Sequence, residues 1–258
     1  MADYSDIKYE KRGRVGILTL NRPNKLNALW PPMEDEIRRC WREFNRDPGA
    51  RSLVITGAGR GFCTGEDVGV LREILEEYSK PGATPQRASA IPQDLIEMVE
   101  KPVVAAVNGA AAGAGFGLAL AADIRIASES AAFHCIYSRR GLVCSCEVWF
   151  LPRLMHLGPA VHKILLGETI DSGEALKYNL VSEVVPDDRL MDRTMEVAER
   201  LAAGPPSALK FTKKAIQNAL ISDLKSSMEY VSYVRGAASS AEADEGGRAF
   251  LEKRPPRW

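Results

Sequence analysis

The sequence predicts an α/β fold in which short buried strands alternate with helices in a layered core. Three features support this prediction. Helical periodicity fills most of the intervals between the strand-like runs, and beyond residue 187 only helical patterns follow. The apolar strand-like runs themselves lie at 14–20, 52–56, 103–107 and 124–127. We therefore expect an α/β core over residues 1–200 and a helical region over residues 201–258.

The first strand and the first helix are well marked. Residues 14–20 (RVGILTL) form an apolar run that ends at the turn-rich Asn-Arg-Pro-Asn of 21–24. A helix is expected near Pro32, because five apolar residues recur at helical spacing on one face. These residues are Met33, Ile37, Cys40, Trp41 and Phe44. Asp47-Pro48-Gly49 should end this helix.

The later elements follow in order. The strand at 52–56 leads through a glycine-rich loop into a helix expected at 67–78. The polar, proline-containing stretch 79–86 is expected to be a mobile surface loop. A short helix at 94–100 precedes VVAAV (103–107), the most strand-like segment of the chain. The remaining expected elements are a glycine turn, a small-residue helix, a strand at 124–127, and helices at 187–203, 207–220 and 224–237.

Composition and charge restrict the class of protein. The chain has 258 residues, of which 45% are hydrophobic and 26% charged, with a formal net charge of zero. A core of this size needs no disulfide or metal to stabilise it. Zero net charge argues against a nucleic-acid binder that relies on electrostatics. The N-terminus carries no apolar signal segment, and the five cysteines indicate reduced thiols, so we expect a cytoplasmic protein outside the membrane.

Two segments share the plan of an apolar strand, a glycine-containing turn and a helix start. The first reaches Cys63-Thr-Gly-Glu-Asp67, and the second reaches Gly113-Ala-Gly115. Such turns leave backbone N–H groups free at a helix N-terminus. Two converging donors would form an oxyanion hole, which stabilises an enolate or tetrahedral oxygen. A dinucleotide-binding turn would need a third glycine, which this sequence lacks. The purely structural interpretation is that the small residues only let a helix pack closely on a sheet.

The chain resembles the crotonase superfamily, the enoyl-CoA hydratase/isomerase family, along nearly its whole length. The stretches that carry the resemblance are NRPNKLNAL (21–29), ITGAGRGFCTGED (55–67), KPVVAAVNG (101–109), ADIRIA (122–127) and EGGRAFLEKR (245–254). The resemblance implies a spiral of β-β-α units, with C-terminal helices that mediate a homotrimer or a dimer of trimers. It also implies an acyl-CoA thioester substrate, so that coenzyme A is part of the substrate and no separate cofactor or metal is expected.

The resemblance also assigns residues by motif position. It implies that the backbone amides of Glu66 and Ala114 form the oxyanion hole, and that Asp67 is mostly structural. Phe250 and Lys253 resemble tail residues that cover the adenine end, often from a neighbouring subunit. The residues implied to line the coenzyme A and pantetheine site are Lys25, Leu26, Ala28, Glu66, Asp67, Val68, Gly69, Gly113 and Ala114.

The proton-transfer residues depart from the family pattern. Hydratases of this family use two glutamates to position and protonate water, and this chain has Gly117 and Tyr137 at those positions. Isomerases place one carboxylate further on, in a Gly-x-x-Pro-Glu/Asp pattern, where this chain has Ser145. This loop is one residue short before the WFLPR of 149–153, so Glu147 can swing into the site.

Several interpretations therefore stay open. Glu147, Tyr137, the Glu66 side chain and Ser145 are the candidate acid/base or nucleophilic groups, although Tyr137 is also a natural core aromatic and Glu147 a natural surface residue. The reaction remains open among hydration, isomerisation, decarboxylation and thioester hydrolysis. The rival from another class is a non-catalytic acyl-CoA-binding protein. The sequence specifies neither the acyl chain nor the pathway, and it does not distinguish a trimer from a hexamer.

Overall fold

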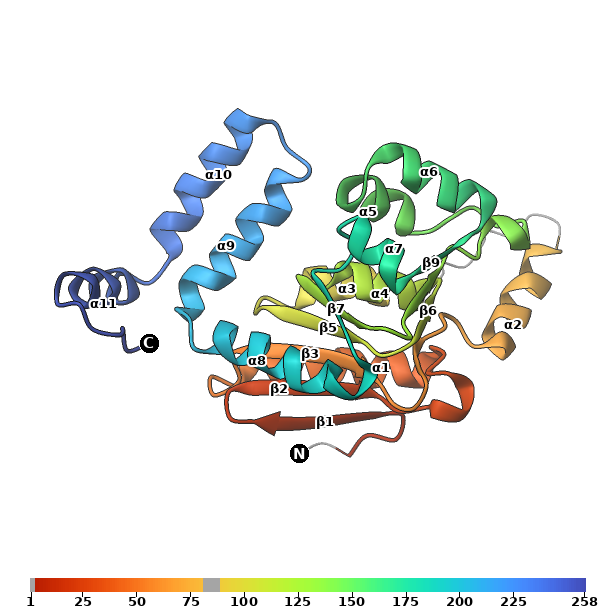
Figure 1. The fold of residues 1–258 in the computed structure, drawn as a ribbon, viewed down its shortest axis with the longest axis horizontal. Coiled ribbons are helices and arrows are strands. Elements are labelled where there is room, and N and C mark those ends of the chain that lie inside the picture. Colours follow the sequence, from red (N-terminus) through yellow and green to blue (C-terminus); the bar gives the residue numbers. More distant parts are fainter. Residues whose placement is uncertain (1–2, 81–88) are drawn as a thin grey trace.

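The computed structural model describes residues 3–80 and 89–258. Residues 81–86 of the expected surface loop lie outside this range. The core is built from repeated strand-strand-helix units, as Figure 1 shows. The first unit comprises β3 (Ser52–Gly57), β4 (Gly61–Cys63), α2 (Val68–Tyr78) and α3 (Ile91–Met98). The second comprises β5 (Val103–Val107), β6 (Ala110–Ala112) and α4 (Ala114–Ala121). The third comprises β7 (Ile124–Ser128), β8 (Ala132–His134), α5 (Glu147–Leu154) and α6 (Leu157–Leu166). This order confirms the expected β-β-α spiral.

The two strands of each unit enter different sheets. The six-stranded sheet has the order β1-β2-β3-β5-β7-β10, and the four-stranded sheet has the order β4-β6-β8-β9. The strands outside the units are β1 (Ile7–Arg12), β2 (Val15–Leu20), β9 (Thr169–Asp171) and β10 (Glu183–Val185). Because β4 and β6 are parallel neighbours, the turns that follow them leave the same edge of the smaller sheet.

Helices cover both faces of the larger sheet. On one side lies α1 (Pro31–Arg46), whose five predicted core residues are all fully buried. On the other side α8 (Leu190–Ala202) packs against Val54, Val104 and Ala106 through Leu190 and Ala198. A sheet buried on both faces needs continuously apolar strands, which explains why β3 and β5 were the clearest strand signals. The helix α7 (Ser172–Lys177) precedes β10, and the 3-10 turns are η1 (Pro23–Lys25), η2 (Ser138–Arg140) and η3 (Asp187–Arg189).

After α8 the chain leaves the core. The helices α9 (Pro206–Ala219) and α10 (Leu224–Ala237) run side by side, and α11 (Ser240–Leu251) lies at the end of the molecule opposite α2 (Figure 1). The structure confirms the two helices predicted at 207–220 and 224–237. In the described part of the chain, none of the helices has the length and apolarity to cross a membrane.

The elements that the sequence did not predict have weak patterns. The strand β1 buries only its first residue, Ile7. The strands β4, β6, β8, β9 and β10 are three residues each, which is too short to show a period. The helix α11 buries only Ala249 but begins with a capping signal, because the Ser239 side chain accepts a hydrogen bond from the Glu242 amide. That Ser-x-x-Glu spacing was the available signal for this helix.

Candidate active site at two glycine turns

The two glycine turns are packed against each other. Gly65 follows β4 with φ +85, and a Cβ built on it would lie 3.3 Å from the backbone nitrogen of Ala114. Gly115 is as constrained, since its Cβ would lie 2.1 Å from the carbonyl oxygen of Cys63. Side chains at these two positions would force the turns apart, so glycine is required for the close approach.

Both predicted amides lie at this junction. Ala114 is the first residue of α4, after Gly113 with φ +51, and a first-turn amide has no intrahelical partner. Glu66 forms a parallel bridge with Leu29. The Leu29 amide donates to the Gly65 carbonyl and the Asp67 amide donates to the Leu29 carbonyl, each at 2.7 Å. In that pattern the N–H of Glu66 points away from Leu29.

The side chains of Glu66 and Asp67 have structural partners. The Glu66 Oε1 accepts a hydrogen bond from the Ser89 amide at 2.5 Å, and burial raises the pKa of Glu66. The Asp67 Oδ1 accepts from the Gly69 amide at 2.9 Å, and Oδ2 pairs with Arg22 at 2.9 Å. The Gly69 amide, followed by Arg22, lowers the pKa of Asp67. The Glu66 side chain is therefore directed to the start of α3, and Asp67 joins α2 to the 21–29 loop.

Asn27, which was not among the predicted site residues, supports the first turn. It is fully buried with φ +57, and its Nδ2 donates to the carbonyls of Gly61 and Phe62 at 2.8 and 3.2 Å. Its Oδ1 accepts the Arg22 amide. Of the predicted residues in this loop, Lys25 is exposed, Leu26 half-buried and Ala28 buried. The only sequence signal for this role was an asparagine in a turn-rich stretch, since the burial and left-handed backbone of Asn27 appear only in the structure.

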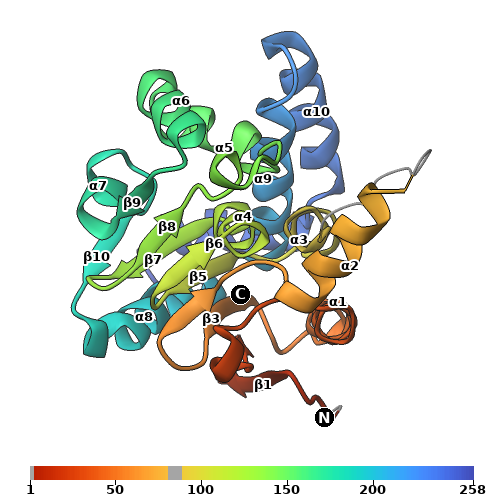
Figure 2. The same cartoon turned by 90° about the vertical axis from the view of Figure 1, so that its right-hand side faces the viewer.

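The position of the first hydratase glutamate has no room for a side chain. Gly117 lies in the first turn of α4, and a Cβ there would lie 2.2 Å from the Cys146 Sγ and 2.9 Å from the Pro92 Cγ. In Figure 2, α4 lies next to both α3 and α5; Pro92 belongs to α3, and Cys146 immediately precedes α5. The sulfur of Cys146, 29 residues later in the chain, thus occupies the space beside Gly117.

Glu147 is a buried carboxylate beside this contact. Its side chain is 0% exposed. Its Oε2 accepts long hydrogen bonds from the Cys144 and Cys146 thiols at 3.7 and 3.8 Å, whereas Oε1 has no partner among residues 3–80 and 89–258. Desolvation raises the pKa of Glu147 to about 7, although its own helix-start amide and the two thiols oppose the shift. A carboxyl group with such a pKa is suited to proton transfer at neutral pH.

Tyr137 lies next to the second glycine turn, and the charge of Glu147 influences its phenol. A Cβ on Gly113 would lie 3.4 Å from the Tyr137 hydroxyl oxygen and 3.3 Å from the Ile136 Cδ1. Burial, and then the charge of Glu147, raise the pKa of the Tyr137 phenol, while Ser145 partly opposes the shift. The phenol is therefore a neutral hydrogen-bond donor next to the turn that carries the Ala114 amide.

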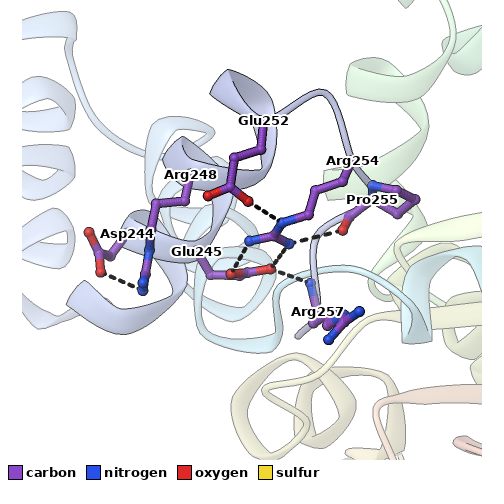
Figure 3. Close-up of polar contacts among 7 residues, drawn as sticks. All are labelled: Asp244, Glu245, Arg248, Glu252, Arg254, Pro255 and Arg257. Atoms are coloured by element: carbon purple, nitrogen blue, oxygen red, sulfur yellow. Dashed lines mark hydrogen bonds and ion pairs between the residues drawn. The ribbon is translucent and has the colours of Figure 1, made fainter.

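The predicted tail residues are not at the two turns of their own chain. Phe250 is 83% exposed, and Lys253 is exposed with φ +53; both belong to the α11 end of the molecule (Figure 1). Figure 3 shows what fixes this end: Arg254 pairs with both Glu245 oxygens at 2.7 and 3.0 Å. Arg254, followed by the Arg257 amide, holds the pKa of Glu245 at about 2.

A groove of about 910 Å³ lies elsewhere, between the α3–α5 side of the core and the α9–α10 pair. Cys146, Trp149, Ile216 and Tyr230 are among its lining residues, whereas Glu66 and Ala114 are not. Cys146 is the residue common to this groove and to the contact with Gly117. The groove is therefore adjacent to the site but does not contain the two amides.

The chain is similar to known proteins over its whole length. The family model described as enoyl-CoA hydratase/isomerase matches residues 10–258. The 1,2-epoxyphenylacetyl-CoA isomerase of Escherichia coli K12 is 36% identical over 252 residues, covering 95% of this chain and 94% of that protein. The short-chain-enoyl-CoA hydratase of Clostridium acetobutylicum is 32% identical over 256 residues, covering 98% and 97%. Among solved structures, an enoyl-CoA hydratase from a Polaromonas species superposes with a TM-score of 0.88 at 33% identity, covering 97% and 98%.

Proposed function

The chain belongs to the enoyl-CoA hydratase/isomerase family and is an acyl-CoA-transforming enzyme of the crotonase type, and from this premise we propose that it isomerises an acyl-CoA thioester. In this proposal Glu147 moves a proton from one acyl carbon to another. The observation that carries it is one buried carboxylate in contact with Cys146, whose sulfur fills the space beside Gly117, the residue that replaces the family's first glutamate.

The thioester oxygen would bind between the amides of Glu66 and Ala114. The contact between Gly65 and the Ala114 nitrogen supports their convergence, and the bridge to Leu29 supports the outward direction of the Glu66 N–H. When a proton leaves the α-carbon, negative charge develops on this oxygen. Backbone donors aimed at such an oxyanion contribute on the order of 10²–10³ in rate for each donor removed.

The proposed step needs only one acid/base group. A C–H bond breaks, its proton forms an O–H bond with Glu147, and the electron pair moves through the acyl carbon to the thioester oxygen. In the second half the enolate collapses and Glu147 returns the proton to a different carbon. Because the group alternates between base and acid, a pKa of about 7 serves both roles at neutral pH.

Hydration is the second candidate, and the position of Tyr137 favours it. A neutral phenol beside Gly113 offers a donor near the position where hydratases of this family carry their second glutamate. In that case Tyr137 and Glu147 would together position water. The solved relative is named as a hydratase and one curated relative as an isomerase, so the names alone do not decide between the two reactions.

A labelled-water assay separates these reactions. The purified chain is incubated with a panel of 2-enoyl-CoA and 3-enoyl-CoA thioesters in H₂¹⁸O, and the products are separated by liquid chromatography and identified by mass spectrometry. Isomerisation gives an unlabelled product of unchanged mass, while hydration adds one ¹⁸O-labelled water. Release of free coenzyme A would instead indicate thioester hydrolysis. Product formation with no loss in Glu147→Gln would contradict the role of this carboxylate.

We also propose that residues 201–258 are an oligomerisation region, with Phe250 and Lys253 contributed to a neighbouring subunit's coenzyme A site. This is supported by apolar side chains that remain exposed on the C-terminal helices, namely Ile216, Leu220, Ile221, Leu224, Met228, Tyr233, Phe250 and Leu251. Light scattering after gel filtration distinguishes a monomer, a trimer and a dimer of trimers. The five cysteines are all unpaired, which supports a reducing, cytoplasmic setting. We propose no separate cofactor.

A further inference from the structure

The carboxylate of Glu147 accepts hydrogen bonds from the thiols of two cysteines that precede it in the chain. Cys144 lies in the loop before α5, and Cys146 is the residue immediately before the helix. Both sulfur atoms approach the same carboxylate oxygen, Oε2, at 3.7 and 3.8 Å. The other oxygen, Oε1, is buried and has no partner in the described parts of the chain. The two oxygens of one carboxylate therefore have different environments.

We propose that Cys144 and Cys146 are positioning residues: their thiols bind Oε2 of Glu147 and so direct Oε1 to exchange a proton with the acyl chain. The proposal rests on the proposed role of Glu147 as the proton-transfer group and adds how that group is oriented. A buried carboxylate with donors on one oxygen loses the freedom to rotate, which is the preorganisation that proton transfer requires.

The thiols are suited to this role because they stay protonated. Burial, and then the charge of Glu147, raise the pKa of Cys146 to about 12 and that of Cys144 further above its ordinary value. A protonated thiol donates weakly to a carboxylate without adding a charge to the site. The donors therefore favour the ionised carboxylate only slightly and leave desolvation as the larger influence on the pKa of Glu147.

Cys146 is itself fixed in place. Its sulfur contacts the backbone of α4 where Gly117 has no side chain, and a Cβ there would come within 2.2 Å. The sulfur thus packs between Gly117 and the Glu147 carboxylate. This contact makes the orientation of Glu147 depend on the same helix whose first residue, Ala114, supplies the proposed oxyanion donor.

The other groups near Glu147 compete little with the two thiols. Tyr137 and Cys135 both respond to the charge of Glu147, and burial raises the pKa of each. On α6, Lys163 is engaged by Glu168 and Glu174 at 3.3 and 2.8 Å. On α5 itself, Arg153 stacks on the Trp149 ring. From α4 the facing residue is Gly117, which carries no titratable group.

Serine and alanine variants isolate the donor. Cys144→Ser/Cys146→Ser keeps a hydroxyl donor at each position, whereas Cys144→Ala/Cys146→Ala removes it at nearly the same side-chain volume. The pKa of Glu147 is read from the infrared carboxyl band that disappears in Glu147→Gln. We expect the alanine pair to show a Glu147 pKa higher than the serine pair by about one unit, because a donor favours the ionised form.

Turnover gives the second measurement. The alanine pair should lose about tenfold in kcat with little change in KM, whereas the serine pair keeps most of its kcat. Equal Glu147 pKa values and equal kcat in the two pairs would overturn the proposal. If the double variants do not fold, the single variants Cys144→Ser and Cys144→Ala repeat the comparison at the position outside the contact with Gly117.

The proton-transfer role of Glu147 and the positioning role of the thiols are tested separately. Full activity in Glu147→Gln would remove the proposed function and this inference with it. An inactive Glu147→Gln, combined with indistinguishable serine and alanine variants, would leave the proton-transfer role of Glu147 intact and remove only the role of the thiols.

Discussion

The sulfur of Cys146 occupies the space that any side chain at Gly117 would need, with only 2.2 Å between it and a Cβ built at position 117. Gly117→Ala is therefore expected to destabilise the fold by about 1–3 kcal/mol through overpacking, even though alanine is the better helix former. In Gly117→Ala/Cys146→Ala the sulfur is gone, and more than half of that loss should be recovered. Urea unfolding measures both values.

A matched control for this pair is Gly236→Ala. Gly236 is also inside a helix, α10, but a Cβ there meets nothing within 4 Å. Alanine should stabilise that helix by up to about 1 kcal/mol. Equal effects of alanine at positions 117 and 236 would contradict the steric explanation.

Removing the carboxylate of Glu147 should abolish most of the activity. Glu147→Gln keeps the shape of the side chain but cannot accept a proton, so kcat is expected to fall on the order of 10²–10⁴-fold. Steady-state kinetics on the thioester identified in the labelled-water assay measures this loss. Glu199→Gln, an exposed glutamate of α8, serves as the control and should retain full activity.

The raised pKa of Glu147 also predicts how stability changes with pH. Its pKa is about 7 in the folded chain against an ordinary value of 4.5, so the folded state binds the extra proton between these values. The stability that this group supports is present below pH 4.5 and is lost as pH rises through 7. Relative to Glu147→Gln, the wild type should lose up to about 3 kcal/mol over this window, measured by urea unfolding at several pH values. A pH-independent difference would contradict the buried, unpaired state of this carboxylate.

The Ala114 amide can be removed with little expected damage to the helix. Proline is tolerated at the first position of a helix, and Ala114 occupies that position in α4. Ala114→Pro should therefore fold but lose on the order of 10²–10³-fold in kcat, because the oxyanion loses a donor. Leu157→Pro places proline at the first position of α6 and should have little effect on kcat. Comparable losses in both variants would point to a folding defect instead.

The ion pair at the tail should influence substrate affinity. Glu245→Gln weakens the contact with Arg254 that fixes the segment carrying Phe250 and Lys253 (Figure 3). We expect KM for the acyl-CoA to rise several-fold with kcat nearly unchanged, since the segment is far from the reacting atoms. Asp244→Asn breaks the exposed pair with Arg248 on the same helix and should leave KM unchanged. A fall in kcat would contradict a binding role.

The sequence predicted the parts of this molecule that have a strong local pattern. The strands β3 and β5 are continuously apolar because both faces are covered, and α1 shows its buried face at helical spacing. The two glycine turns were visible for the same reason, since their residues lie next to recognisable strands. The smaller sheet was not visible, because strands of three residues carry no period.

The environment of Glu147 was beyond the sequence for a different reason. Its burial and its contacts depend on how α5 packs against α4, and Cys146 meets Gly117 across 29 residues of chain. The sequence named Glu147 as one of several candidates but gave no sign of which would be desolvated. Asn27 is similar, since its buried hydrogen bonds to the carbonyls of β4 exist only in the assembled loop.

Glu66 has two structural roles. Its main chain borders the junction of the glycine turns, and its carboxylate accepts a hydrogen bond from the Ser89 amide, which precedes α3. A displacement of α3 would thus reach the glycine turns through Glu66, as well as through the packing of α3 on α4. Substitutions that shift α3 would in this way also shift the main chain of Glu66. The packing of α3 should consequently influence the rate of the step that the Glu66 amide is proposed to assist.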